Sequence, residues 1–291
     1  MYSSYNLVTN DNINYTVDML RLKTTLTYSD FSKLEFHLKT SYSKYIKKNY
    51  ISGGISDFKY NYVIELEEGK SFWFGFLHNS EIMNNPHSMQ NVNTEFNFTI
   101  EFNPNKIPIQ GFLKYVLNLT TNWIIKSLDM AMDIRVNILD LCGFDKGRKK
   151  DFRMFSCGKD NRTYYIGRTN NRIKIYNKKL ESNLNYDLTR IEITSKLDLK
   201  VKDIGIYQYD IKLPELYLNN YLYTFKDYED KTLLAILYAV QSGFSLNDLT
   251  RRYKDKVKSL LNGGYKINLD NKYCTEVIKK SIIYIFEKRL V

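Results

Sequence analysis

"TYYIGRTNNRIKIYNKK" (Thr163–Lys179) is the segment whose pattern decides the fold class. Two runs rich in β-branched and aromatic residues flank a polar turn near residues 169–171, and this pattern predicts a β-hairpin. Side chains two residues apart lie on the same face of a strand. The alternation therefore predicts that Tyr176 shares one strand face with three basic side chains, those of Arg172, Lys174 and Lys178.

Further segments with strand character lie on both sides of this hairpin. Residues 59–78 predict a second hairpin that turns at EEGK. Single strands are predicted at 13–28, 96–104, 127–136 and 188–196. Helical spacing is expected from Ser29 or Asp30 onward and again at 108–123. Hairpins join antiparallel strands, so these segments predict a mainly antiparallel sheet with packed helices.

The pattern changes to helices after Glu229. The run at 231–240 is followed by a turn at Gly243 and a basic helix expected over residues 245–259. This order has the outline of a helix-turn-helix. We therefore predict an α+β protein with a mainly antiparallel sheet domain at 1–228 and a helical C-terminal segment at 229–291.

Composition indicates the class of partner and the compartment. The 291 residues are 43% hydrophobic, and the formal net charge is +11, which favours a nucleic acid or an anionic membrane. AT-rich coding, which enriches Asn, Lys, Ile and Tyr, is an alternative source of this charge. The longest apolar run is far too short to span a bilayer, and no secretory signal is visible. The three cysteines lack zinc-type spacing, so we expect a cytoplasmic protein without a membrane partner.

Several common catalytic sites are disfavoured. The sequence has neither GxxxxGK[ST] nor GxGxxG, which are the usual phosphate-binding loops. Its three histidines form neither HExxH nor an H-x-H pair. A histidine-bound metal and a Ser-His-Asp triad are therefore not expected.

Acidic residues on strand faces are the better candidates. Asp129 and Asp133 share one face of a predicted strand, and Glu101 and Glu192 lie on polar faces of two others. If these strands are neighbours, the carboxylates converge and suit a hard cation such as Mg²⁺ or Mn²⁺. The alternative is that amphipathic strands simply expose their acids to water.

Tyr176 is a candidate nucleophile. A phenol that attacks a phosphodiester forms a phosphotyrosine and frees a 3′-hydroxyl, and nearby positive charge is expected to favour the phenolate. Arg172, Lys174, Lys178 and Arg190 are placed to supply this charge. The alternative is an ordinary strand tyrosine, since the chain contains 25 of them.

Four motifs in order carry a resemblance to a known family. EFNPNK, LDMAMD, TYYIG-x5-IKIYNKKLE and LTRIEI follow one another at similar spacing. Together they resemble the Rep-trans family, which comprises rolling-circle replication initiators of small Gram-positive plasmids and related relaxases of conjugative elements. The resemblance covers residues 95–195, and the segment AILYAVQSGFSLNDLTRRYKDKVKSLL resembles the C-terminal part of the plasmid initiators.

This resemblance implies an activity and roles for residues. Tyr176 matches the nicking tyrosine that forms a covalent 5′-phosphotyrosine, and Lys178 matches the lysine that follows it. The acidic positions, which imply bound Mg²⁺ or Mn²⁺, are Glu101, Asp129, Asp133 and Glu192. The implied partners are origin DNA, both duplex and single-stranded at the nick, a host helicase and a second copy of the chain. The expected DNA contacts are Arg172, Lys174, Arg190, Arg251, Arg252 and Lys254.

The chain also departs from the family pattern. Ser127-Leu128 stands where the family has an arginine, the serine after Y-x-G is missing, and Lys174 replaces an arginine. Two alternatives therefore stay open, a non-catalytic protein that binds an origin and a relaxase for conjugative transfer. For the basic helix, the alternatives are a major-groove reader with Arg251 and Arg252 on base edges, or an ordinary surface helix.

Overall fold

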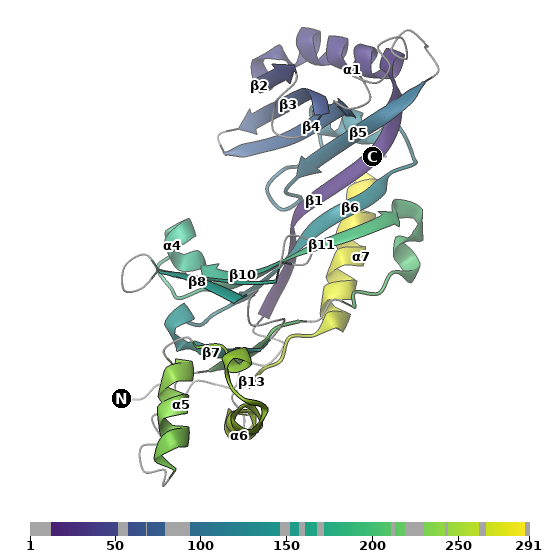
Figure 1. Ribbon diagram of the computed structural model, residues 1–291. Helices are drawn as coiled ribbons and strands as arrows, with labels where there is room; N and C mark the ends of the chain where they lie inside the picture. Colours follow the sequence, from purple (N-terminus) through teal and green to yellow (C-terminus); the bar gives the residue numbers. More distant parts are fainter. Residues whose placement is uncertain are drawn as a thin grey trace. The chain divides into compact units, whose positions relative to one another are not determined.

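The computed structural model describes most of the 291-residue chain. The described ranges are 13–51, 58–67, 69–78, 94–145, 152–156, 161–167, 172–210, 213–218, 230–241, 244–261 and 266–288. Figure 1 traces their strands and helices. The predicted α+β class is confirmed, because one large antiparallel sheet is combined with separate helices.

Ten strands form this large sheet, in the order β2-β3-β4-β5-β1-β6-β11-β10-β9-β8. The pairings with a described register are all antiparallel. The strands are β1 (Ile13–Thr27), β2 (Ile46–Ile51), β3 (Phe58–Glu67), β4 (Lys70–His78), β5 (Glu95–Phe102), β6 (Ile124–Ile134), β8 (Phe152–Ser156), β9 (Arg162–Ile166), β10 (Ile173–Asn177) and β11 (Thr189–Lys200). A three-stranded sheet contains β7 (Leu141–Asp145), β12 (Glu215–Leu218) and β13 (Lys266–Ile267).

Helices connect and follow these strands. The α-helices are α1 (Tyr28–Ser41), α3 (Gly111–Leu117), α4 (Lys178–Ser182), α5 (Lys231–Gln241), α6 (Arg251–Leu261) and α7 (Asn271–Lys288). The 3₁₀ turns are η2 (Ser43–Tyr45), η4 (Ile138–Asp140), η6 (Val201–Ile206) and η8 (Leu246–Asp248). Within the described ranges, no helix combines the length and the apolar character needed to cross a membrane.

The chain divides into two compact units. The first unit comprises residues 1–16, 130–195 and 208–275, and the second comprises 17–129, 196–207 and 276–291. The domain division predicted at 228/229 stays a prediction, because residues 219–229 lie outside the described ranges.

An aromatic core holds the second unit together. Phe31 of α1 stacks on Phe76 of β4 with 4.1 Å between ring centroids, and both rings are buried. The helix begins at Tyr28, slightly earlier than predicted, because the Thr27 side chain accepts a hydrogen bond from Asp30 N (3.1 Å). The predicted hairpin at β3 and β4 is confirmed, and Gly69 takes the positive φ (72°) that its turn requires.

The hairpin of β9 and β10 in the first unit is also confirmed. Its isoleucines, including Ile173 and Ile175, are buried on one face. One detail of the prediction is wrong, since Lys178 does not continue the strand. The strand ends at Asn177, whose side chain accepts a hydrogen bond from Leu180 N (3.2 Å) and starts α4 at Lys178. Arg172 lies just before β10 and is exposed.

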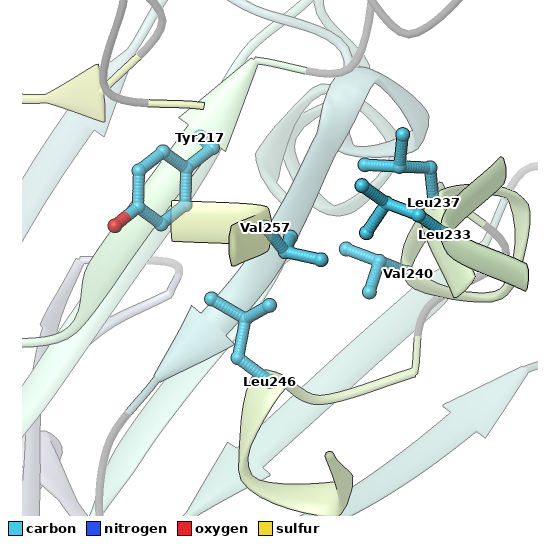
Figure 2. Close-up of a cluster of buried hydrophobic side chains, with 6 residues drawn as sticks. All are labelled: Tyr217, Leu233, Leu237, Val240, Leu246 and Val257. Atoms are coloured by element: carbon cyan, nitrogen blue, oxygen red, sulfur yellow. The ribbon is translucent and has the colours of Figure 1, made fainter. Parts of the chain in front are cut away.

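The C-terminal part of the first unit has its own apolar cluster. Figure 2 shows its six buried side chains, Tyr217, Leu233, Leu237, Val240, Leu246 and Val257. The helix predicted over 245–259 is interrupted, because η8 ends at Asp248 and α6 begins only at Arg251. Ser245 accepts a hydrogen bond from Asn247 N (3.1 Å) and so starts the short turn that inserts Leu246 into the cluster. The predicted turn at Gly243 lies outside the described ranges.

The aromatic core makes a stability prediction. Phe98→Ala removes a fully buried ring, so we expect the free energy of unfolding to fall by about 3–5 kcal/mol. Phe36→Ala is the matched control, because that ring is 70% exposed, and its effect should stay within about 0.5 kcal/mol. Urea unfolding followed by circular dichroism measures both values. Equal losses for the two variants would contradict the assignment of this core.

Candidate active site

The candidate site lies on the polar face of β9, β10 and the part of β11 that belongs to the first unit; Figure 1 labels β10 and β11. In the antiparallel register, Tyr176 stands opposite Arg190, and Lys174 stands opposite Glu192. On the other side of β10, strand β9 places Thr163 opposite Tyr176 and Tyr165 opposite Lys174. Directly paired residues point to the same side of a sheet, so these side chains share one face. The opposite face carries the buried isoleucines of the three strands.

A hydrogen bond joins the two central side chains. The Tyr176 hydroxyl donates to Glu192 Oε1 at 2.6 Å, and the tyrosine is only 5% exposed. Lys174 Nζ lies 3.8 Å from the centroid of the Tyr176 ring and 3.9 Å from Glu192 Oε2. Lys178 Nζ lies 5.9 Å from the same ring centroid. The structure therefore brings together four predicted site residues, Tyr176, Lys174, Lys178 and Glu192.

Glu181 is a further member of the site that the sequence analysis did not single out. Its carboxylate forms an ion pair with Lys178 in the first turns of α4. Burial acts to raise the pKa of Glu181, but the hydrogen bond and charge of Lys178, the nearby Tyr176 hydroxyl and the charge of Lys174 hold that pKa below its ordinary value. The available signal was spacing, because Glu181 lies three residues after Lys178 and such pairs meet on a helix.

The ionisation state of Tyr176 differs from the expectation. Burial is the main cause that raises the pKa of its phenol, followed by the hydrogen bond to Glu192 and the negative charges of Glu192 and Glu181. The charge of Arg190 opposes these causes and is smaller. Positive charge therefore favours the phenolate as expected, but burial and the two carboxylates outweigh it in this arrangement. The neutral phenol is favoured, and it must lose its proton when it reacts.

The predicted acidic ligands are each engaged elsewhere. Asp133 accepts two hydrogen bonds from Arg190, at 2.6 and 2.7 Å, and both side chains are 11% exposed. Glu192 contacts Tyr176 and Lys174, as described above. In the second unit, Glu101 forms an ion pair with Arg21, and Asp129 lies half-buried on β6.

In this arrangement several of the expected metal ligands already have other partners, and the binding of a divalent cation stays a prediction. Across the part of the chain that the structure describes, no three His, Cys, Asp or Glu side chains group closely enough to hold a metal ion. The carboxylate oxygens of Asp133 already receive the guanidinium of Arg190, which is itself a cation. Mg²⁺ or Mn²⁺ would have to replace such partners, so no catalytic step is derived through a metal.

The predicted DNA contacts fall into two groups. Arg172, at the start of β10, and Arg251 and Arg252, at the start of α6, are exposed, and the Arg251 side chain is 96% exposed. Lys254 instead donates to Asn247 Oδ1 (2.9 Å). Arg190 is held by Asp133. The first group is accessible to a polyanion, although Arg251 also lies 4.0 Å from the carboxylate of Asp255, whereas the second has partners within the protein.

Comparisons with solved structures give a distant likeness. No family model matches the sequence, and neither does any curated protein. Among solved structures, a rolling circle replication initiator protein from Geobacillus stearothermophilus is similar, with 13% sequence identity and a TM-score of 0.38. The match covers 88% of this chain and 98% of that chain. This likeness is too distant to assign a function.

The buried phenol predicts a pH dependence of stability. The pKa of Tyr176 is raised in the folded chain, so the unfolded chain loses this proton first as the pH rises. The stabilisation from the protonated phenol is therefore complete below about pH 10 and is lost above it. Relative to Tyr176→Phe, the unsubstituted chain should lose about 1 kcal/mol between pH 9 and pH 11.

Urea unfolding at the two pH values measures this difference. Tyr186→Phe, at a tyrosine that is 42% exposed, is the control and should keep the pH dependence of the unsubstituted chain. If Tyr176→Phe also keeps that dependence, the phenol is not held protonated by its surroundings.

Proposed function

We propose that this chain is a plasmid replication initiator that nicks and rejoins one DNA strand at the origin, with Tyr176 as the nucleophile. The observation that carries the proposal is the Tyr176 hydroxyl, which donates to the Glu192 carboxylate while Lys174 lies against the same ring. A nucleophile that is hydrogen-bonded to a base and lies beside a cation is suited to attack a phosphodiester. The net charge of +11 favours a polyanionic substrate.

The proposed reaction begins with a proton transfer. Glu192 accepts the hydroxyl proton as Tyr176 Oη attacks the scissile phosphorus. The new bond is the phosphotyrosine ester, and the bond to the 3′-oxygen breaks. That oxygen takes a proton from water and becomes the 3′-hydroxyl that primes synthesis. Lys174 stabilises the negative charge on the non-bridging oxygens. Rejoining reverses these steps, and Glu192 returns the proton to Tyr176.

Access to the phenol requires a local rearrangement. Tyr176 is 5% exposed, and the ammonium groups of Lys174 and Lys178 lie beside its ring. Lysine side chains are long and flexible, so they form the part of this cover that a DNA strand displaces most easily. Their positive charge also favours the approach of a phosphate. Lys174 and Lys178, which cover the phenol, would therefore also make the first contacts with a phosphate.

The remaining DNA contacts are proposed from exposure. Arg172, Arg251 and Arg252 are the accessible members of the expected set, and α6 would present its two arginines to a DNA groove. Arg190 would reach DNA only after leaving Asp133. A host helicase and a homodimer stay predictions. A conjugative relaxase uses the same chemistry and differs in the DNA that it cleaves.

Substitution of the nucleophile tests the proposal. The substrate is supercoiled circular DNA that carries the coding gene of this chain with its flanks. Tyr176→Phe should lower nicking by about 10³-fold or more, because only the attacking oxygen is lost. Glu192→Gln should lower it by about 10²–10⁴-fold, because the base is lost. Duplex binding should change by less than about twofold in both variants. Gel electrophoresis of the nicked circle and a detergent-resistant DNA adduct provide the two measurements.

Tyr165→Phe is the matched control, since Tyr165 lies on the same sheet face opposite Lys174. It should nick like the unsubstituted chain. Undiminished nicking by Tyr176→Phe would overturn the assignment, and Tyr164 and Tyr165 would become the next candidates. Tight origin binding without nicking by the unsubstituted chain would favour the non-catalytic alternative.

The metal requirement has a separate test. The acidic residues on the strand faces predict that EDTA stops nicking, that Mg²⁺ or Mn²⁺ restores it, and that Asp129→Ala or Glu192→Ala loses it. The carboxylates already have partners that a cation would have to displace. We therefore expect either cation at about 5 mM to raise the Tm of the DNA-free chain by no more than about 1–2 °C. Full nicking in EDTA would remove the metal from the proposal. A large Tm increase would show that the cation displaces the ion pairs without DNA.

A further inference from the structure

The second unit contains a basic cleft that the proposed nicking chemistry does not use. Its volume is about 540 Å³, and three lysines, Lys23, Lys200 and Lys202, contribute to its lining. The other lining residues are threonines, asparagines, Trp123 and Ile124, and none of them is acidic. Glu95 accepts a hydrogen bond from the lining Thr25 (2.5 Å) but does not itself line the cleft, and neither does Asp203. All of the lining residues belong to the second unit, whereas Tyr176 belongs to the first.

Hydrogen bonds place the lining segments firmly. Val201 N donates to Trp123 O (2.9 Å), and this bond holds the segment with Lys200 and Lys202 beside the start of β6. The Trp123 indole is buried and donates to Leu117 O (3.0 Å). Thr24 Oγ1 donates to Asn122 O (3.3 Å), which ties β1 to the same segment. These hydrogen bonds hold the backbone segments that carry the lysines, whereas the lysine side chains themselves are flexible.

The cleft borders a wider group of cations in the same unit. Lys126 of β6 is half-buried, and burial is the main cause that lowers its pKa. The positive charges of Arg21, Lys23 and Lys196 lower that pKa further and outweigh the opposing charge of Asp198. Asp198 also forms an ion pair with Lys23. Cations that are crowded in this way gain from a polyanion that lies across them.

We propose that this cleft binds the phosphate backbone of duplex DNA, as a second DNA contact separate from the nicking face. Lysine ammonium groups and threonine and asparagine side chains are typical partners of phosphate oxygens and carry little sequence information. The inference rests on the proposed function only in taking DNA as the partner.

The lining argues against two other ligands. Small-molecule pockets are mostly apolar, and nucleotides and single strands commonly stack a base on an exposed aromatic ring. The one aromatic residue of this lining, Trp123, is buried and offers no free ring face. Contact with the backbone of a duplex needs no such ring. The lining residues therefore favour duplex DNA as the ligand.

The test uses the full chain with Tyr176→Phe in every sample, so that cleavage does not consume the DNA. The first variant adds Lys200→Gln and Lys202→Gln, at two exposed lysines. The charge-matched control adds Lys33→Gln and Lys44→Gln, at two exposed lysines of the same unit that lie outside the cleft. A third protein carries Lys200→Arg and Lys202→Arg, which keeps the charge and checks that the segment tolerates substitution.

Fluorescence anisotropy measures binding to a random duplex of about 20 base pairs over about 50–200 mM KCl. Each phosphate contact contributes about 0.9 to the slope of log K against log salt, so the glutamine variant should lose about 1–2 of that slope. The Lys33/Lys44 control and the arginine variant should keep the parent slope. An unchanged slope in the glutamine variant would overturn the proposal.

Binding of single-stranded DNA and of ATP tests the two alternatives to duplex DNA as the ligand. A loss of affinity for single-stranded DNA of the same length, with an unchanged duplex slope, would overturn the duplex assignment. A loss of ATP binding with an unchanged duplex slope would reveal a nucleotide pocket and would also overturn it. The adduct assay on the unsubstituted chain is independent of all these variants, so failure of the nicking proposal is separately visible.

Discussion

The pairing register of β10 with β11 is the constraint on which the candidate site depends. It sets Tyr176 opposite Arg190 and Lys174 opposite Glu192, and so permits the hydrogen bond between Tyr176 and Glu192. A slip of one residue would turn every side chain of the strand to the other face. The buried isoleucines on that other face prevent the slip, because they would become exposed. Apolar packing therefore positions a polar, reactive group that contributes little to the packing itself.

Charge pairing and burial decide the protonation state of Tyr176 in the structure. The Arg190–Asp133 pair is largely buried, and loss of one partner from such a pair costs about 3–5 kcal/mol. Arg190 is therefore held in place, and its charge only partly offsets the carboxylates around Tyr176. The lysines near the ring are paired with Glu192 and Glu181. A phosphate could compete for these lysines, and under the proposed function such competition would link DNA binding to exposure of the phenol.

The positive charge of the chain is divided among several surfaces. The exposed arginines of α6 belong to the first unit, and the lysines of the cleft belong to the second. The other cations of α6 also have partners, for example Lys258 with Glu215 (2.6 Å) and the exposed Lys256 with Asp230 (3.7 Å). A helix that looks uniformly basic in sequence thus presents mainly its first turn to a partner. Net charge predicts a polyanion, whereas the pairing decides where it can bind.

The sequence by itself determined the α+β class, both hairpins and the shared strand face of Lys174 and Tyr176, because strand periodicity and turn chemistry are local. It did not show that the Asn177 side chain ends the strand before Lys178, or that Leu246 anchors a separate turn ahead of α6. Nor could it assign partners to the acids. Asp133 holds Arg190 and Glu192 holds Tyr176, while Glu101 pairs with Arg21 in the other unit. These pairings join residues far apart in the chain. Only the tertiary structure decided them, because cross-strand register and side-chain competition for cations do not follow from local spacing.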